Sequence, residues 1–112
     1  MDSQKTTIPN DILLAEVGRL LQDGGNVELK TSGDSMEPFI RGGRDSVLLR
    51  KMSADFIEEG DIVLAEISDG HYVLHRVIKV QGKTLTLMGD GNLSGVERCK
   101  SDKVCGVVLK II

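Results

Sequence analysis

Residues 61–88 read DIVLAEISDGHYVLHRVIKVQGKTLTLM, and this stretch is the most informative about the fold. Apolar and polar residues alternate along parts of it, as in Lys83–Leu87, and two glycine-containing dipeptides, Asp69-Gly70 and Gln81-Gly82, divide it. A period of two is typical of strands with one buried face, and such dipeptides are typical of tight turns. The stretch therefore predicts three short strands joined by turns, over residues 61–67, 71–80 and 83–88.

The pattern continues on both sides of this stretch. Alternating segments at 27–32, 45–50 and 103–111 predict three more strands, and the breaks again contain glycine, as in Gly42-Gly43 and Gly89-Asp90-Gly91-Asn92. The chain holds 13 Gly but only 2 Pro, which fits many tight turns between short strands. About six strands of this kind predict a mainly β domain with a coiled, barrel-like sheet.

One segment departs from the β pattern. Apolar residues recur at helical spacing between Asn10, which can cap a helix, and the pair Gly24-Gly25, which can end it. We therefore predict an N-terminal amphipathic α-helix over 10–23, a β-rich core over 26–112, and a single domain over 10–112. Residues 1–9 are polar and predict a flexible N-terminus. The apolar face of the helix is expected to pack on the domain; the alternative is docking to a partner protein or a membrane surface.

Composition excludes several classes of protein. The net charge is −3 and aromatic residues make up 3% of the 112 residues, which disfavours nucleic acid as a partner. The chain has neither an apolar run of about 18 residues nor a secretion signal, which predicts a soluble, cytoplasmic protein, with peripheral membrane association through the helix as an alternative. Cys99 and Cys105 are expected to be reduced thiols, because a chain without an export signal stays in a reducing compartment. A zinc site is not expected, because neither His71 nor His75 completes a ligand spacing with the two cysteines. No metal and no cofactor is expected.

Three polar clusters carry candidate chemistry. Ser35 lies in a glycine-containing bend that can expose a hydroxyl beside free backbone N–H groups, although serine in such a bend is usually an ordinary turn residue. His75 lies within a strand, either as a satisfied half-buried histidine or as a general base. Asp90 lies between two glycines, either in an Asx-turn or as the carboxylate that orients a histidine.

The order of these clusters is more specific than any one of them. The chain reads Ser-Gly-Asp-Ser-Met-Glu-Pro from Ser32, then Gly-Asp-Ile-Val from Gly60, His-Arg-Val from His75, and Gly-Asp-Gly-Asn from Gly89. This order resembles the signal peptidase I superfamily, which also contains the LexA-type self-cleaving repressors. It is most similar to the archaeal, endoplasmic-reticulum and SipW-type signal peptidases, and the resemblance runs from about Val27 to Ile111.

The resemblance implies a role for each matching position. Ser35 stands where the nucleophile stands, His75 where the general base stands, and Asp90 where the acidic residue stands. Residues around the nucleophile would form the oxyanion hole and bind substrate: Gly33, Asp34, Ser35 and Met36. The chain departs from the family pattern because Asp34 is inserted before Ser35 and a glycine follows Asp90. Glu97 and Asp102 are therefore further candidates for the acid.

The resemblance implies a serine endopeptidase that hydrolyses an extended, signal- or leader-peptide-like substrate with a Ser–His dyad assisted by an acid. The alternative is a non-catalytic or self-processing LexA-like regulatory or binding module. Only about 30 residues precede Ser35, too few for a helix-turn-helix domain with a linker, and no Ala-Gly or Cys-Gly bond lies upstream of it. Both observations disfavour a repressor. A membrane anchor precedes the serine in the resembled enzymes, whereas this chain has the predicted helix there.

Overall fold

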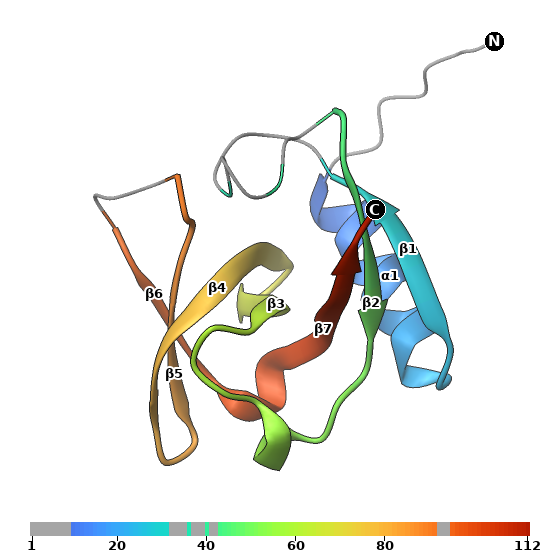
Figure 1. Cartoon of the computed structure of the whole chain (residues 1–112). Coiled ribbons are helices and arrows are strands. Elements are labelled where there is room, and N and C mark those ends of the chain that lie inside the picture. The colour runs from blue at the N-terminus through green and yellow to red at the C-terminus, as the bar shows by residue number, and fades with distance from the viewer. Residues whose placement is uncertain (1–9, 32–35, 37–39, 41–42, 92–94) are drawn as a thin grey trace, which may run out of the picture.

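The computed structural model describes residues 10–31, 36, 40, 43–91 and 95–112, with side chains from Ala15 onward. In these ranges the chain forms one α-helix, seven strands and two short 3-10 helices (Figure 1). The helix is α1 (Asn10–Gln22), and the 3-10 helices are η1 (Ala54–Phe56) and η2 (Ser101–Lys103). The strands are β1 (Asn26–Lys30), β2 (Ser46–Arg50), β3 (Ile62–Ser68), β4 (His71–Gln81), β5 (Thr84–Met88), β6 (Glu97–Lys100) and β7 (Val104–Ile111).

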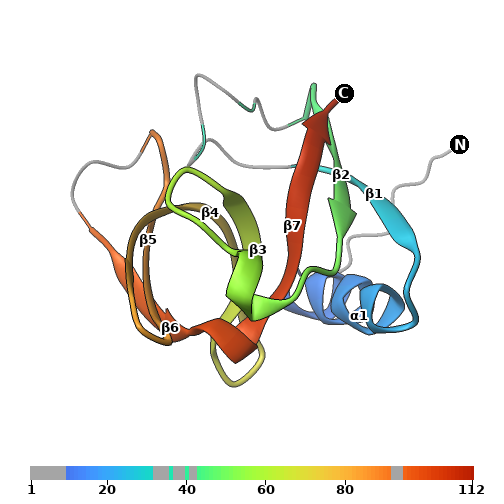
Figure 2. The same cartoon turned by 60° about the horizontal axis from the view of Figure 1, so that its bottom comes forward.

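All seven strands belong to one antiparallel sheet with the order β1-β2-β7-β3-β4-β5-β6. The strands from β3 to β6 follow one another along the chain and curl into a roll (Figure 2). The chain then returns through η2 to β7, which inserts between β2 and β3. The sheet therefore has a rolled half and a flatter half, β1-β2-β7, beside which α1 lies (Figure 1).

The two faces of β3 contribute to two separate cores, because successive side chains of a strand point to opposite faces. Ile62 and Leu64 join a helix-side core, completed by Val17, Leu21, Leu29, Met36, Ile40, Val47 and Leu49. Val63 and Ala65 join a roll core, completed by Ile57, Val77, Leu85, Leu87, Cys99, Val104 and Val107. The strand β3 is thus covered on both faces, which explains its nearly unbroken apolar sequence.

Buried side chains and two glycines allow α1 to pack closely on the sheet. Val17 and Leu21 are buried in the helix-side core. A Cβ atom at Gly106 of β7 would lie 2.8 Å from Cδ1 of Leu21 and 3.3 Å from the carbonyl oxygen of Arg50. A Cβ atom at Gly18 would lie 3.3 Å from Sγ of Cys105. Two glycines therefore allow the helix and β7 to approach each other more closely than side chains would permit.

The structure confirms the mainly β fold, the curled sheet and the N-terminal helix. The six strands predicted from the sequence all form, with ends that agree or differ by at most two residues, and the helix ends at Gln22. The seventh strand, β6, was not predicted, because Cys99 is the only apolar residue in Glu97–Lys100. The predicted flexible segment 1–9 lies outside the described residues. In the part of the chain that is described, no helix is long and apolar enough to cross a membrane.

Candidate active site

His75 lies in the middle of β4 with its side chain turned into the roll. It pairs with Val63 of β3, and it shares its face of the strand with Val77, two residues further on. Both valines belong to the roll core, and His75 itself is 7% exposed. A polar ring so deeply buried needs a hydrogen-bond partner.

Glu97 is that partner. It opposes Leu87 of β5, which in turn opposes Val77 of β4, so all three side chains lie on the inner face of the roll. His75 Nδ1 and Glu97 Oε1 are 2.8 Å apart, at hydrogen-bonding distance. The strands β4, β5 and β6 curl around the roll (Figure 2), and the contact joins β4 to β6 across the intervening β5. Within the described ranges, Nε2 of His75 has no hydrogen-bond partner.

Asp90, which the sequence pattern proposed as the acid beside His75, pairs with Arg76 instead. Arg76 Nε donates to Asp90 Oδ1 over 2.8 Å, and Nη2 donates to Oδ2 over 2.7 Å. Its Nη1 donates to the carbonyl oxygen of Gly60 over 2.7 Å. The hydrogen bond that Arg76 donates to Asp90 raises the pKa of the Arg76 guanidinium. Neighbouring side chains of a strand point to opposite faces, so the Asp90 carboxylate is held on the face opposite His75.

Of the serine box, the structure describes Met36, whereas Gly33, Asp34 and Ser35 lie outside the described residues. The Met36 side chain is 4% exposed and belongs to the helix-side core. Its Sδ accepts the N–H of Asp90 over 3.4 Å, and its carbonyl oxygen accepts the N–H of Ile40 over 3.1 Å. The residue that follows Ser35 in the chain is therefore anchored beside the turn after β5.

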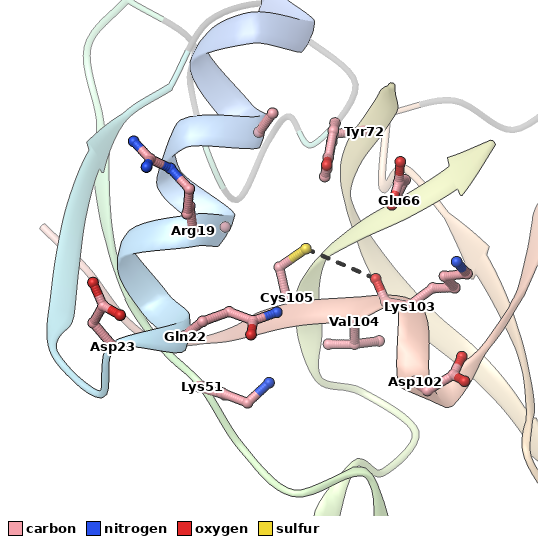
Figure 3. A pocket seen from close by; sticks show the side chains of 12 residues that line it. Arg19, Gln22, Asp23, Lys51, Glu66, Tyr72, Asp102, Lys103, Val104 and Cys105 are labelled. Carbon is pink, nitrogen blue, oxygen red and sulfur yellow. Dashed lines mark hydrogen bonds between the residues drawn. The ribbon is translucent and has the colours of Figure 1, made fainter. Parts of the chain in front are cut away.

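A separate groove lies between α1 and the start of β7, with a volume of about 640 Å³ (Figure 3). Its lining comprises Ala15, Gly18, Arg19, Gln22, Asp23, Lys51, Glu66, Tyr72, Asp102, Lys103, Val104 and Cys105. Asp102, the third acid considered from the sequence, belongs to this groove rather than to the pair of His75 and Glu97. Cations and anions alternate around the rim, so the groove does not favour a ligand of one charge.

The two cysteines are free thiols, as expected. Burial raises the pKa of both Cys99 and Cys105 above the ordinary value for a thiol. Among the described residues, no three His, Cys, Asp or Glu side chains are grouped so as to hold a metal ion.

A sequence model of the Peptidase S24-like family matches residues 2–109. The match covers almost the whole chain, so this chain belongs to the Peptidase S24-like family, within the LexA and signal peptidase I-like superfamily. No curated protein matches the chain at a significant level. The finer likeness to the archaeal, endoplasmic-reticulum and SipW-type signal peptidases stays a prediction.

From the sequence, His75 was predicted as the general base and Glu97 only as one of two further candidates for the acid. No role was predicted for Arg76. The missing information was the strand β6, whose register places Glu97 opposite Leu87. A signal for Arg76 was present, because its neighbour His75 shares its parity along the strand with the apolar Val73 and Val77. An arginine next to it must then point to the other face and find its own carboxylate.

Proposed function

We propose that this protein is a serine endopeptidase in which Ser35 is the nucleophile, His75 the general base and Glu97 the carboxylate that orients His75. One observation carries the proposal above all. The contact of 2.8 Å between His75 Nδ1 and Glu97 Oε1 joins a histidine and a carboxylate on the inner face of the roll. Serine peptidases use such a pair to activate a hydroxyl. Membership of the Peptidase S24-like family supports the same class of chemistry.

The chemistry follows from the two nitrogens of the ring. When Nδ1 carries the proton and donates it to Glu97, Nε2 of the neutral imidazole presents a lone pair. Nε2 then accepts the Ser35 hydroxyl proton as Oγ attacks the peptide carbonyl, and later delivers that proton to the leaving amine. Glu97 keeps the ring in this tautomer and stabilises the imidazolium between the two steps.

The contact of Met36 supports the proposed partnership of Ser35 and His75. Met36 directly follows Ser35, and consecutive Cα atoms are about 3.8 Å apart. Its sulfur accepts the N–H of Asp90, and the Asp90 carboxylate holds Arg76, the neighbour of His75. Two described contacts thus link the residue after the nucleophile to the strand that carries the base. Backbone N–H groups of the segment from Gly33 to Met36 would then donate to the oxyanion.

The free edge of β1 supports an extended substrate. In the described sheet, β1 is an edge strand that pairs with β2. Thr31 N–H donates to Asp45 O, and the pairing alternates from there, so the main-chain groups of Glu28 and Lys30 point away from β2. A peptide laid along this edge would reach the serine box, which follows β1 in the chain. The resemblance implies small residues before the cleaved bond.

A library of peptides with Ala-X-Ala segments, read by mass spectrometry, tests the proposal. The wild-type protein and the control variant His71→Ala are expected to cleave the same peptides, because His71 lies exposed at the start of β4. Ser35→Ala and His75→Ala are expected to leave these peptides intact. Cleavage that survives in Ser35→Ala would contradict the mechanism. A library left intact by every form would favour the non-catalytic module.

A further inference from the structure

The segment between β1 and β2, which carries the serine box, is closed at its base by Thr31 and Asp45. The Oγ1 hydroxyl of Thr31 donates to the carbonyl oxygen of Asp45 over 2.8 Å, and the N–H of Thr31 donates to the same oxygen over 3.0 Å. Thr31 is 8% exposed and Asp45 7%. One buried carbonyl thus receives both donors of one residue, so the first residue after β1 is held by its main chain and its side chain.

Gly43 completes this base. Its N–H donates to the carbonyl oxygen of Thr31 over 2.8 Å, and its φ is +80°, a left-handed conformation that favours glycine. Thr31 therefore bonds to both Gly43 and Asp45, which are two residues apart, so the regular pairing of β1 with β2 ends here. We call Thr31, Gly43 and Asp45 the basal clamp.

Hydrogen bonds of the neighbouring residues Arg44 and Ser46 hold Asp45 in place. The guanidinium of Arg44 binds the Asp45 carboxylate through two hydrogen bonds of 2.6 Å and 2.9 Å. The next residue, Ser46, exchanges two main-chain hydrogen bonds with Ile112 just beyond β7, of 2.7 Å and 3.4 Å. The carbonyl that receives Thr31 is therefore fixed to a three-stranded part of the sheet rather than to a free loop.

We propose that the Thr31 hydroxyl is a positioning group for Ser35, an inference that rests on the proposed function. Thr31 and the buried Met36 are the described residues on either side of 32–35, so they fix both ends of the four-residue stretch that ends in the nucleophile. Loss of the Thr31 hydroxyl loosens the end of the stretch at Thr31 and leaves the end at Met36 unchanged. A nucleophile displaced by about 1 Å can lose roughly 100-fold in rate.

Three variants test this role. Thr31→Val replaces the hydroxyl by a methyl group at nearly constant volume, Thr31→Ser keeps the hydroxyl, and Thr86→Val makes the same chemical change on β5 as a matched control. We expect kcat for peptide cleavage to fall about 10-fold to 100-fold in Thr31→Val, with KM changed less than about twofold. Thr31→Ser and Thr86→Val are expected to stay near the wild-type kcat. Equal kcat in Thr31→Val and Thr86→Val would overturn the positioning role.

Hydrogen exchange of the Gly43 amide tests the clamp without reference to catalysis. Thr31→Val removes the hydrogen bond from Thr31 Oγ1 to the Asp45 carbonyl oxygen, which should speed exchange of the Gly43 amide about tenfold. Thr86→Val should leave this exchange unchanged. Unchanged exchange in Thr31→Val would overturn the clamp itself. If Ser35→Ala cleaves like the wild type, the proposed function fails and the positioning role with it, whereas a rapid Gly43 exchange in Thr31→Val would still establish the clamp.

Discussion

His75 and Arg76 are neighbours on β4, and each binds a different carboxylate on a different face of the sheet. His75 contacts Glu97 inside the roll, and Arg76 contacts Asp90 on the other face. The alternation of a strand thereby separates a candidate proton-transfer pair from a structural ion pair, although the two begin at adjacent residues. The two acids should therefore respond differently to the same kind of substitution.

Glu97→Gln is expected to lower kcat for peptide cleavage by about 100-fold or more, with little change in the free energy of unfolding. A glutamine amide can donate to Nδ1 of His75, which moves the ring proton to Nε2 and removes the lone pair that the base needs. Steady-state kinetics beside thermal unfolding would measure both quantities. Asp90→Asn is the matched control, and a larger loss of kcat in Asp90→Asn than in Glu97→Gln would contradict the assignment.

Arg76→Lys is expected to lower the free energy of unfolding by about 2 kcal/mol. Lysine cannot reproduce the fork that bonds both oxygens of Asp90, nor the bond from Nη1 to Gly60 O. Urea denaturation measures the change, and Lys79→Arg, an exchange in the opposite direction at an exposed position of β4, is the control. Equal midpoints for Arg76→Lys and the wild type would show that the fork contributes nothing.

Gly106→Ala is expected to destabilise the fold by about 1–2 kcal/mol. The added Cβ would meet Leu21 Cδ1 at 2.8 Å and the Arg50 carbonyl oxygen at 3.3 Å, and the fully buried Leu21 has little room to move. Gly25→Ala adds the same methyl group where nothing lies within 4 Å. Thermal unfolding should therefore separate the two variants, and an unfolding midpoint for Gly106→Ala at or above that of Gly25→Ala would contradict the close packing of α1 on β7.

The two thiols should react slowly with iodoacetamide at pH 8 compared with a free cysteine. Burial raises the pKa of Cys99 and of Cys105, so a smaller share of each is the reactive thiolate at that pH. Cys105, which is half-buried beside the groove, should react before the buried Cys99. Rates should keep rising above pH 9, as mass spectrometry of the alkylated peptides would show. Reaction of Cys99 before Cys105 would contradict the described burial.

The same raised pKa values fix the sign of a stability change. The folded state binds the thiol protons more tightly than the unfolded chain does, so their contribution is fully present below the ordinary thiol pKa and is lost as pH rises through the folded pKa. Urea midpoints measured from pH 8 to pH 10 should therefore fall less in Cys99→Ala than in the wild type. An identical fall in both would show that Cys99 makes no such contribution.

Most of the fold could be predicted because short apolar-rich segments are separated by turn residues. In the stretch 61–88, these turns contain glycines of positive φ at Gly70 and Gly82. The strand β6 could not be predicted in this way, because it lies at the sheet edge with a mostly polar sequence and makes its pairing by tertiary contact. The two-sided burial of β3 has a signal in the apolar run Ile62–Ala65, whose residues alternate between the two cores in the structure.

The candidate site was predictable to the extent that it lies on recognisable strands. His75 could be named from its strand and its motif, and the structure shows its side chain buried inside the roll. The acid could not be chosen from sequence, because Asp90 and Glu97 differ in the face they reach, which depends on the unpredicted register of β6. The basal clamp could not be predicted, because its key acceptor is the main-chain carbonyl oxygen of Asp45. Every residue has such an oxygen, so the residue types do not indicate which one accepts.

Trapping the covalent intermediate would show whether Ser35 attacks the peptide bond. The protein is mixed with a cleaved peptide, quenched in acid and digested with trypsin, and the fragment from Thr31 to Arg41 is weighed and fragmented. We predict an ester on Ser35 whose added mass equals that of the amino-terminal product less one water, and which is absent in Ser35→Ala. A peptide cleaved at the wild-type rate by Ser35→Ala, with no such adduct in the wild type, would contradict the account.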